Sequence, residues 1–157
     1  MNGVAAGAGA NIAFACDITI ASKSATFIQS FSKIGLVPDS GGTFFIPRLA
    51  GLQRATALMM LGDKITADTA LNYGLIYMVV DDESIKDHAF TLALKLASLP
   101  TAALGLTKKA LNKSLFSTLE EQLDTEGELQ EAAGNTHDFK EGVTAFIEKR
   151  KAVFKGE

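Results

Sequence analysis

The first sixteen residues, MNGVAAGAGANIAFAC, constrain the fold more than any other part of the chain. Between Ala5 and Ala10 no side chain is larger than a methyl group, and the segment 8–15, AGANIAFA, is apolar on nearly every side. A helix of that kind is stable only when other elements surround it. Small residues also allow a ligand to lie close to the main chain. We therefore predict a short, buried helix over residues 8–15.

The order of predicted elements separates a small α/β part from a long helical part. Short apolar stretches at 17–21, 25–29 and 76–80 are typical of strands. Helix signals dominate from residue 40 onward, and the expected helices span 51–61, 66–73, 84–98, 101–115, about 118–133 and 138–150. Ser117 and Glu120 have the spacing of a capping box. This order lacks the regular strand–helix alternation of a doubly wound sheet.

Composition excludes several classes of protein. The 157 residues carry 15 basic and 18 acidic side chains, a net charge of -3, which gives no electrostatic basis for nucleic-acid binding. A single cysteine, Cys16, excludes an internal disulfide and fits a reducing compartment. One cysteine with two distant histidines, His88 and His137, does not predict a metal site. We find neither a signal peptide nor a transmembrane span, and therefore expect a cytoplasmic protein with no membrane partner.

The start of the 8–15 helix is a candidate oxyanion site. The GAGAN at residues 7–11 does not complete a dinucleotide-binding motif, because Ile12 stands where the third glycine should fall. If the helix begins near Ala8, its first N–H groups are free and lie at the positive end of the helix dipole. Such groups can stabilise a developing oxyanion. Close packing of a buried helix explains the small residues equally simply, and spacing alone favours that alternative.

A second candidate is Asp39 in the stretch 35–42, GLVPDSGG. Pro-Asp-Ser-Gly favours a turn, and Asp39 or Ser40 is suited to cap a helix that follows. Apolar residues flank the turn on both sides, at 34–37 and 44–46. Such surroundings can make a carboxylate a general base. Local sequence alone favours the cap.

Taken together, these segments resemble the crotonase (enoyl-CoA hydratase/isomerase) superfamily. The resemblance runs from residue 2 to the end and is carried by NGVAAGAGANIAFACDITIAS, FSKIGLVPDSGGTFFIPRLAG, ALMMLGDKITADTALNYGLI and DFKEGVTAFIEKRKAVF. It implies an α/β fold, the ββα superhelix or crotonase-like spiral, truncated at its N-terminus. Residues 1–82 would form the C-terminal part of the spiral core, and residues 83–157 a helical trimerisation region.

The resemblance also implies a chemistry. Family members bind acyl-CoA thioesters and hold the enolate with two backbone N–H groups, of which the second corresponds to Ala8. Hydratases usually carry two glutamates at the positions of Asn11 and Phe31, and neither of these residues transfers a proton. Several isomerases carry an aspartate at the position of Asp39, which is therefore the implied general base. The most similar subgroup is the ring 1,2-epoxyphenylacetyl-CoA isomerases of phenylacetate degradation.

The resemblance places further residues at the substrate. These are Gly7, Asn11, Phe31, Leu36 and Lys149, with Phe14 and Phe27 as additional apolar walls. It implies that Lys149 reaches the CoA phosphate of a neighbouring subunit, in a trimer or a dimer of trimers. Coenzyme A enters as part of the substrate, and no separate cofactor or metal is expected. Two alternatives remain open: an enoyl-CoA hydratase of fatty-acid β-oxidation, and a non-catalytic assembly fragment.

Overall fold

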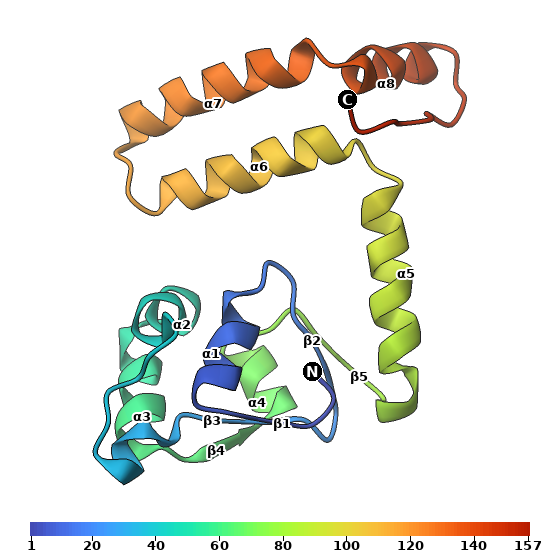
Figure 1. Cartoon of the computed structure of the whole chain (residues 1–157). Helices are drawn as coiled ribbons and strands as arrows, with labels where there is room; N and C mark the ends of the chain where they lie inside the picture. The colour runs from blue at the N-terminus through green and yellow to red at the C-terminus, as the bar shows by residue number, and fades with distance from the viewer. The chain divides into compact units, whose positions relative to one another are not determined.

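The computed structural model describes residues 1–157 and divides into two compact units, Met1–Ala89 and Phe90–Glu157. Helix α5 (Ile85–Ala97) contains the division between them (Figure 1). The boundary predicted from the sequence, between residues 82 and 83, lies just before this helix. Below, unit 1 denotes Met1–Ala89 and unit 2 denotes Phe90–Glu157.

The larger of two small sheets in unit 1 has the order β1-β3-β4. Strand β3 (Thr26–Ile28) lies in its centre, parallel to β1 (Val4–Ala6) and antiparallel to β4 (Lys64–Thr66). In this register Phe27 is opposite both Ala5 and Ile65. The sequence predicted β3 but neither neighbour. The residues of β1 stand in a run of small side chains, and those of β4 lie between two helix signals, so neither shows the apolar pattern of a strand.

The second sheet pairs β2 (Ile20–Ser22) with β5 (Met78–Val80) in parallel. The strand predicted at 17–21 was placed too early, since only its last two residues join the sheet. The residues before them form a bend and an irregular segment, and the Thr19 hydroxyl donates a hydrogen bond to the Ala13 carbonyl at 2.6 Å. The strand predicted at 76–80 shortens to β5 at its C-terminal end.

The helices of unit 1 follow the predicted order. They are α1 (Ala8–Ala15), α2 (Gly42–Ala50), α3 (Leu52–Leu61) and α4 (Ala67–Asn72), with short 3-10 helices η1 (Ser30–Ile34) and η2 (Asp82–Ser84). Thr66 caps α4 by accepting a hydrogen bond from the Thr69 N–H, and α3 ends at Gly62 in the left-handed conformation. Both helix ends were predicted from these residue types.

Helix α1 lies within the core of unit 1, close to the strands (Figure 1). Its Ala10, Ala13 and Phe14 are buried, and the rings of Phe14 and Phe27 lie 4.9 Å apart. The prediction of an entirely buried helix is wrong at Ile12, which is 60% exposed in this chain. The helix therefore buries one side against the sheet and leaves another open.

Unit 2 is built from α6 (Thr101–Ser114), α7 (Leu119–Gly134), α8 (His137–Ile147) and the end of α5. Helices α6 and α7 run side by side in opposite directions (Figure 1). The predicted capping box is wrong by one residue. Thr118 caps α7 and exchanges hydrogen bonds with Glu121, whereas the Ser117 hydroxyl donates back to the Lys113 carbonyl of α6.

The last residues fold back onto α8 and are held there by two carboxylates. Glu141 accepts two hydrogen bonds from the Arg150 guanidinium, at 2.6 and 2.8 Å, and a third from the Val153 N–H. Arg150 and the Val153 N–H together lower the pKa of Glu141 to about 2. Burial raises the pKa of Asp138, but hydrogen bonds from the Lys155 and Gly156 N–H groups outweigh burial and leave it below its ordinary value.

No single helix of the chain is long and apolar enough to cross a membrane. The bent pair formed by Asp82–Ala97 and Thr101–Ser114 reaches the required length and composition only when the two helices are counted together.

Candidate functional site

The N-terminus of α1 has the geometry of a free donor site. Gly7 precedes the helix with φ 52°, a conformation that favours glycine, and no side chain caps the helix. The Gly7 N–H donates to the Ile28 carbonyl at 2.9 Å, which fixes the helix start to the end of β3. The N–H groups of the first turn, beginning with Ala8, have no acceptor within the helix.

Phe31 packs against the same turn at the start of α1. It lies in η1, is buried, and its ring is 3.4 Å from the point where a Cβ on Gly7 would stand. A Cβ at position 7 would meet this ring at ordinary contact distance, so the positive φ of Gly7 is what makes a larger residue unfavourable there. Phe31 thus packs against Gly7 and helps to fix where the helix begins.

One turn further along α1, the Asn11 side chain joins three segments of the chain. It is fully buried, and its Nδ2 donates to the Asp39 carbonyl at 2.8 Å. Its Oδ1 accepts a hydrogen bond from Gln29 Nε2 at 2.7 Å. Both polar ends of Asn11 are thus used inside the protein, and the residue exposes no surface to a substrate in this chain.

Gly42 makes room for this contact. It is the first residue of α2, and a Cβ at this position would lie 2.4 Å from Asn11 Nδ2 and 2.6 Å from both Cγ and Oδ1. A real Cβ essentially never lies this close to an atom to which it is not bonded, so any larger residue would displace Asn11. The absence of a side chain at residue 42 is therefore a condition for the link between α1 and the Asp39 turn.

Asp39 lies in the turn between η1 and α2, and its side chain is exposed. Its carbonyl accepts hydrogen bonds from Asn11 Nδ2 and from the Gly42 N–H at 2.9 Å. Its carboxylate makes no hydrogen bond and no ion pair within the chain. The predicted cap on α2 is wrong for both Asp39 and Ser40, because the N-cap is Gly41 and no side chain bonds to the helix.

Asp39 therefore has a backbone fixed by Asn11 and a carboxylate free of hydrogen bonds and ion pairs. Asn11 lies three residues after Ala8 on the same helix, and it is bonded directly to the residue whose carboxylate is unpaired. This joins the free N–H groups of α1 to Asp39 through one rigid contact. Free N–H donors can stabilise an oxyanion, and an unengaged carboxylate on a backbone linked to the same helix can move a proton.

An apolar hollow of about 370 Å³ adjoins the Asp39 turn. It is lined by Leu36, Val37 and Pro38 on one side and by residues of α2 and α3 on the other, including Pro47 and Met59. Leu36 is 59% exposed and lines the hollow, as a substrate-binding role would require. Phe14 and Phe27 are instead packed against each other in the core, so their predicted role as pocket walls is wrong.

Lys149 belongs to unit 2 and follows α8. It has φ 54°, an unusual conformation for a residue other than glycine, and its N–H donates to the Phe146 carbonyl at 3.3 Å. The exposed side chain extends from the turn that ends the helix. Its contact with a CoA phosphate stays a prediction.

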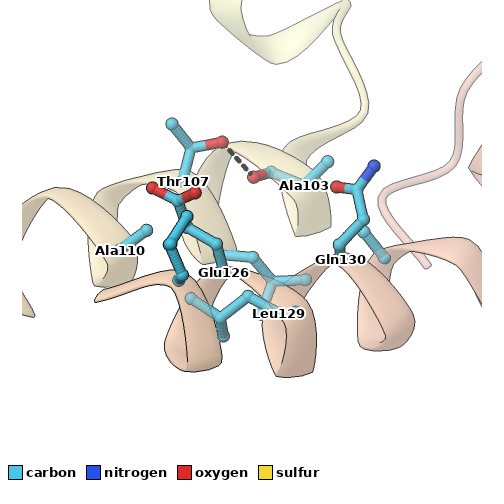
Figure 2. A pocket seen from close by; sticks show the side chains of 10 residues that line it. Ala103, Thr107, Ala110, Glu126, Leu129 and Gln130 are labelled. Atoms are coloured by element: carbon cyan, nitrogen blue, oxygen red, sulfur yellow. Dashed lines mark hydrogen bonds between the residues drawn. The ribbon is translucent and has the colours of Figure 1, made fainter. Parts of the chain in front are cut away.

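The hollow between α6 and α7 offers no comparable chemistry. Figure 2 shows Ala103, Thr107 and Ala110 of α6 next to Glu126, Leu129 and Gln130 of α7. The hollow that these residues line has a volume of about 550 Å³. The Thr107 hydroxyl donates a hydrogen bond to the Ala103 carbonyl at 2.9 Å. One carboxylate among small and aliphatic side chains makes a packing groove, not a set of reacting groups.

Sequence reasoning missed two residues of this site, Gln29 and Gly42. Gln29 is a buried amide at the end of a predicted strand, where an apolar residue is usual. That contrast was the available signal for Gln29. No local sequence signal shows that residue 42 must be glycine, because this requirement comes from a contact with Asn11, 31 positions earlier.

Comparison with known proteins identifies the family to which this chain belongs. The model of the enoyl-CoA hydratase/isomerase family matches residues 1–157. The chain belongs to that family. It is 50% identical over 157 residues to the 1,2-epoxyphenylacetyl-CoA isomerase of Escherichia coli (strain K12), a match that covers 100% of this chain and 60% of that protein.

Hydratases of the enoyl-CoA hydratase/isomerase family are also similar to the chain. It is 38% identical to the short-chain-enoyl-CoA hydratase of Clostridium acetobutylicum, over 96% of this chain and 58% of that protein. The crystal structure of an enoyl-CoA hydratase from Bacillus anthracis superposes with a TM-score of 0.95 at 36% identity, over 99% of this chain and 60% of that one. The predicted crotonase-like α/β fold is thereby confirmed, and the chain spans about 60% of the length of these relatives.

Proposed function

We propose that this chain carries the proton-transfer part of an acyl-CoA isomerase site. The Ala8 N–H donates to the thioester carbonyl oxygen, and the Asp39 carboxylate removes a proton alpha or gamma to that carbonyl. The electron pair of the broken C–H bond moves into the enolate, whose oxygen the N–H stabilises. Asp39 then returns the proton to another carbon, so that a double bond shifts and no atom is gained or lost.

The observation that carries this proposal is the unpaired Asp39 carboxylate on a backbone that Asn11 ties to α1. A base must be free to accept a proton and must stay at a fixed distance from the carbonyl that the helix polarises. A carboxylate engaged in capping α2 would not meet the first condition, and no such cap exists.

An isomerase is favoured over a hydratase by two side chains. Asn11 and Phe31 stand where hydratases of the family usually carry glutamates, and neither transfers a proton. Asn11 is also engaged at both ends. Asp39 is left as the acid/base residue, and one residue that removes a proton from one carbon and delivers a proton to another suffices for an isomerisation.

We further propose an enoyl-CoA or 1,2-epoxyphenylacetyl-CoA type thioester as the substrate, in phenylacetate degradation. The name of the Escherichia coli relative supports the substrate class, and the apolar hollow beside Leu36 is suited to an apolar acyl group. The reaction requires no cofactor, because coenzyme A is part of the substrate. A cytoplasmic trimer or dimer of trimers completes the proposal.

The test uses the native polypeptide that contains these residues. A 3-enoyl-CoA thioester is incubated with it in D2O, and mass spectrometry measures the deuterium taken up by the thioester. Asp39→Asn should slow exchange by about 10²-fold or more and leave thioester binding nearly intact. Asp87→Asn is the matched control, since Asp87 is an exposed carboxylate on α5. Equal exchange by Asp39→Asn and the control would exclude Asp39 as the base.

Measurements of crotonyl-CoA hydration and of oligomeric state separate the alternatives. Hydration of crotonyl-CoA that is lost in Asp39→Asn would identify a hydratase with an unusual acid/base residue. A defined oligomer without turnover of any acyl-CoA would identify a non-catalytic assembly protein.

A further inference from the structure

The contact between Gln29, Asn11 and Asp39 has a fixed direction. The Asp39 carbonyl accepts hydrogen bonds and cannot donate one, so Asn11 must present its Nδ2 to it. That orientation turns Asn11 Oδ1 toward Gln29, which must then present Nε2. If Gln29 turned its amide over, two oxygens would face each other in the core. Each amide thus determines the orientation of the next.

The arrangement leaves one polar atom without a partner. Gln29 Oε1 is buried and accepts no hydrogen bond, although Gln29 is only 3% exposed. Buried acceptors without partners are uncommon because they lose their hydrogen bonds to water. An apolar side chain would avoid this cost. The hydrogen bond that Gln29 Nε2 donates to Asn11 Oδ1 explains why a glutamine stands at this position.

We propose that Gln29 is a positioning residue for the proton-transfer reaction. It holds the Asn11 amide in the orientation that donates to the Asp39 carbonyl, and so holds the Asp39 carboxylate at a fixed place relative to the α1 N-terminus. This inference rests on the proposed function of Asp39. Gln29 itself touches neither the carboxylate nor, being buried, a substrate.

The decisive variant is Gln29→Glu, which keeps the shape of the side chain and removes the donor. The Asn11 amide is then expected to turn its Nδ2 toward the new carboxylate and its oxygen toward the Asp39 carbonyl, which releases the turn. Gln53→Glu makes the same chemical change on the exposed surface of α3 and is the control. Gln29→Met removes the donor without adding a charge, and decides the question if the buried glutamate prevents folding.

Two measurements on the native polypeptide are required. Hydrogen exchange of residues 35–42 should be faster in Gln29→Glu and Gln29→Met than in Gln53→Glu, because the Gly42 N–H bonds to the same Asp39 carbonyl. The kcat for deuterium exchange into a 3-enoyl-CoA should fall about 10–100-fold, as a misplaced base predicts, with KM changed less than about twofold. A purely structural role for Gln29 would not divide the effect in this way.

The outcomes distinguish this inference from the function on which it rests. If Asp39→Asn exchanges as fast as wild type, Asp39 is not the base and the proposed function fails. If Asp39→Asn is inactive while both Gln29 variants match Gln53→Glu in kcat and in loop exchange, only the positioning role is overturned. Faster loop exchange together with a lower kcat in the Gln29 variants supports it.

Discussion

Replacing Gly42 by alanine tests the contact that links α1 to the Asp39 turn. The new Cβ would lie 2.4 Å from Asn11 Nδ2, whereas ordinary contact begins at 3.4 Å, so Asn11 must move by about 1 Å. Its two hydrogen bonds, now 2.8 and 2.7 Å long, would then exceed the distance at which such bonds hold.

The magnitude follows from those two bonds. A buried polar group left without its partner costs about 1–3 kcal/mol, so losing both bonds costs about 2–6 kcal/mol. Alanine is better than glycine in a helix by up to about 1 kcal/mol, which offsets part of the loss. We expect Gly42→Ala to lower the free energy of unfolding of unit 1 by about 1–5 kcal/mol.

The control for this prediction is Gly9→Ala in α1. Gly9 also lies in a helix of unit 1, but nothing is within 4 Å of its Cβ position, so this variant should be neutral or slightly stabilising. Urea unfolding followed by circular dichroism gives the free energy, and hydrogen exchange reports unit 1 separately from unit 2. If Gly42→Ala and Gly9→Ala were equally stable, the Asn11 contact would have no energetic weight and the reasoning would be refuted.

Two further predictions concern unit 2. Thr118→Ala should lower the free energy of unfolding by about 1 kcal/mol through loss of the α7 cap, whereas Ser117→Ala should change it by less than about 0.5 kcal/mol; thermal unfolding of both variants checks this, and the reverse order would restore the capping box predicted from sequence. Because the pKa of Glu141 falls from 4.5 to about 2, its stabilising contacts are fully present above pH 4.5 and are lost as the pH falls toward 2. The Val153 amide NMR signal should titrate with a midpoint near 2, and a midpoint near 4.5 would contradict the contacts with Arg150.

The sequence determined the features that depend on a few consecutive residues. The α1 helix, the cap at Thr66 and the helix end at Gly62 were all predicted, because capping and backbone conformation are set by adjacent positions. The local pattern marked the start of α1 and Asp39 only as candidates, and favoured close packing and a helix cap for them. The family resemblance assigned Ala8 and Asp39 their chemical roles. The roles of both residues stay predictions until the exchange experiment is made.

Tertiary structure decided everything that depends on distant residues meeting. Strands β1 and β4 exist because β3 pairs with both. Thr118 rather than Ser117 is the cap because the Ser117 hydroxyl is bonded to the Lys113 carbonyl at the end of α6. The link from Gln29 through Asn11 to Asp39 joins three segments that no local pattern connects. Local propensity acts over a few residues, whereas a buried hydrogen bond forms only where packing brings two partners within about 3 Å.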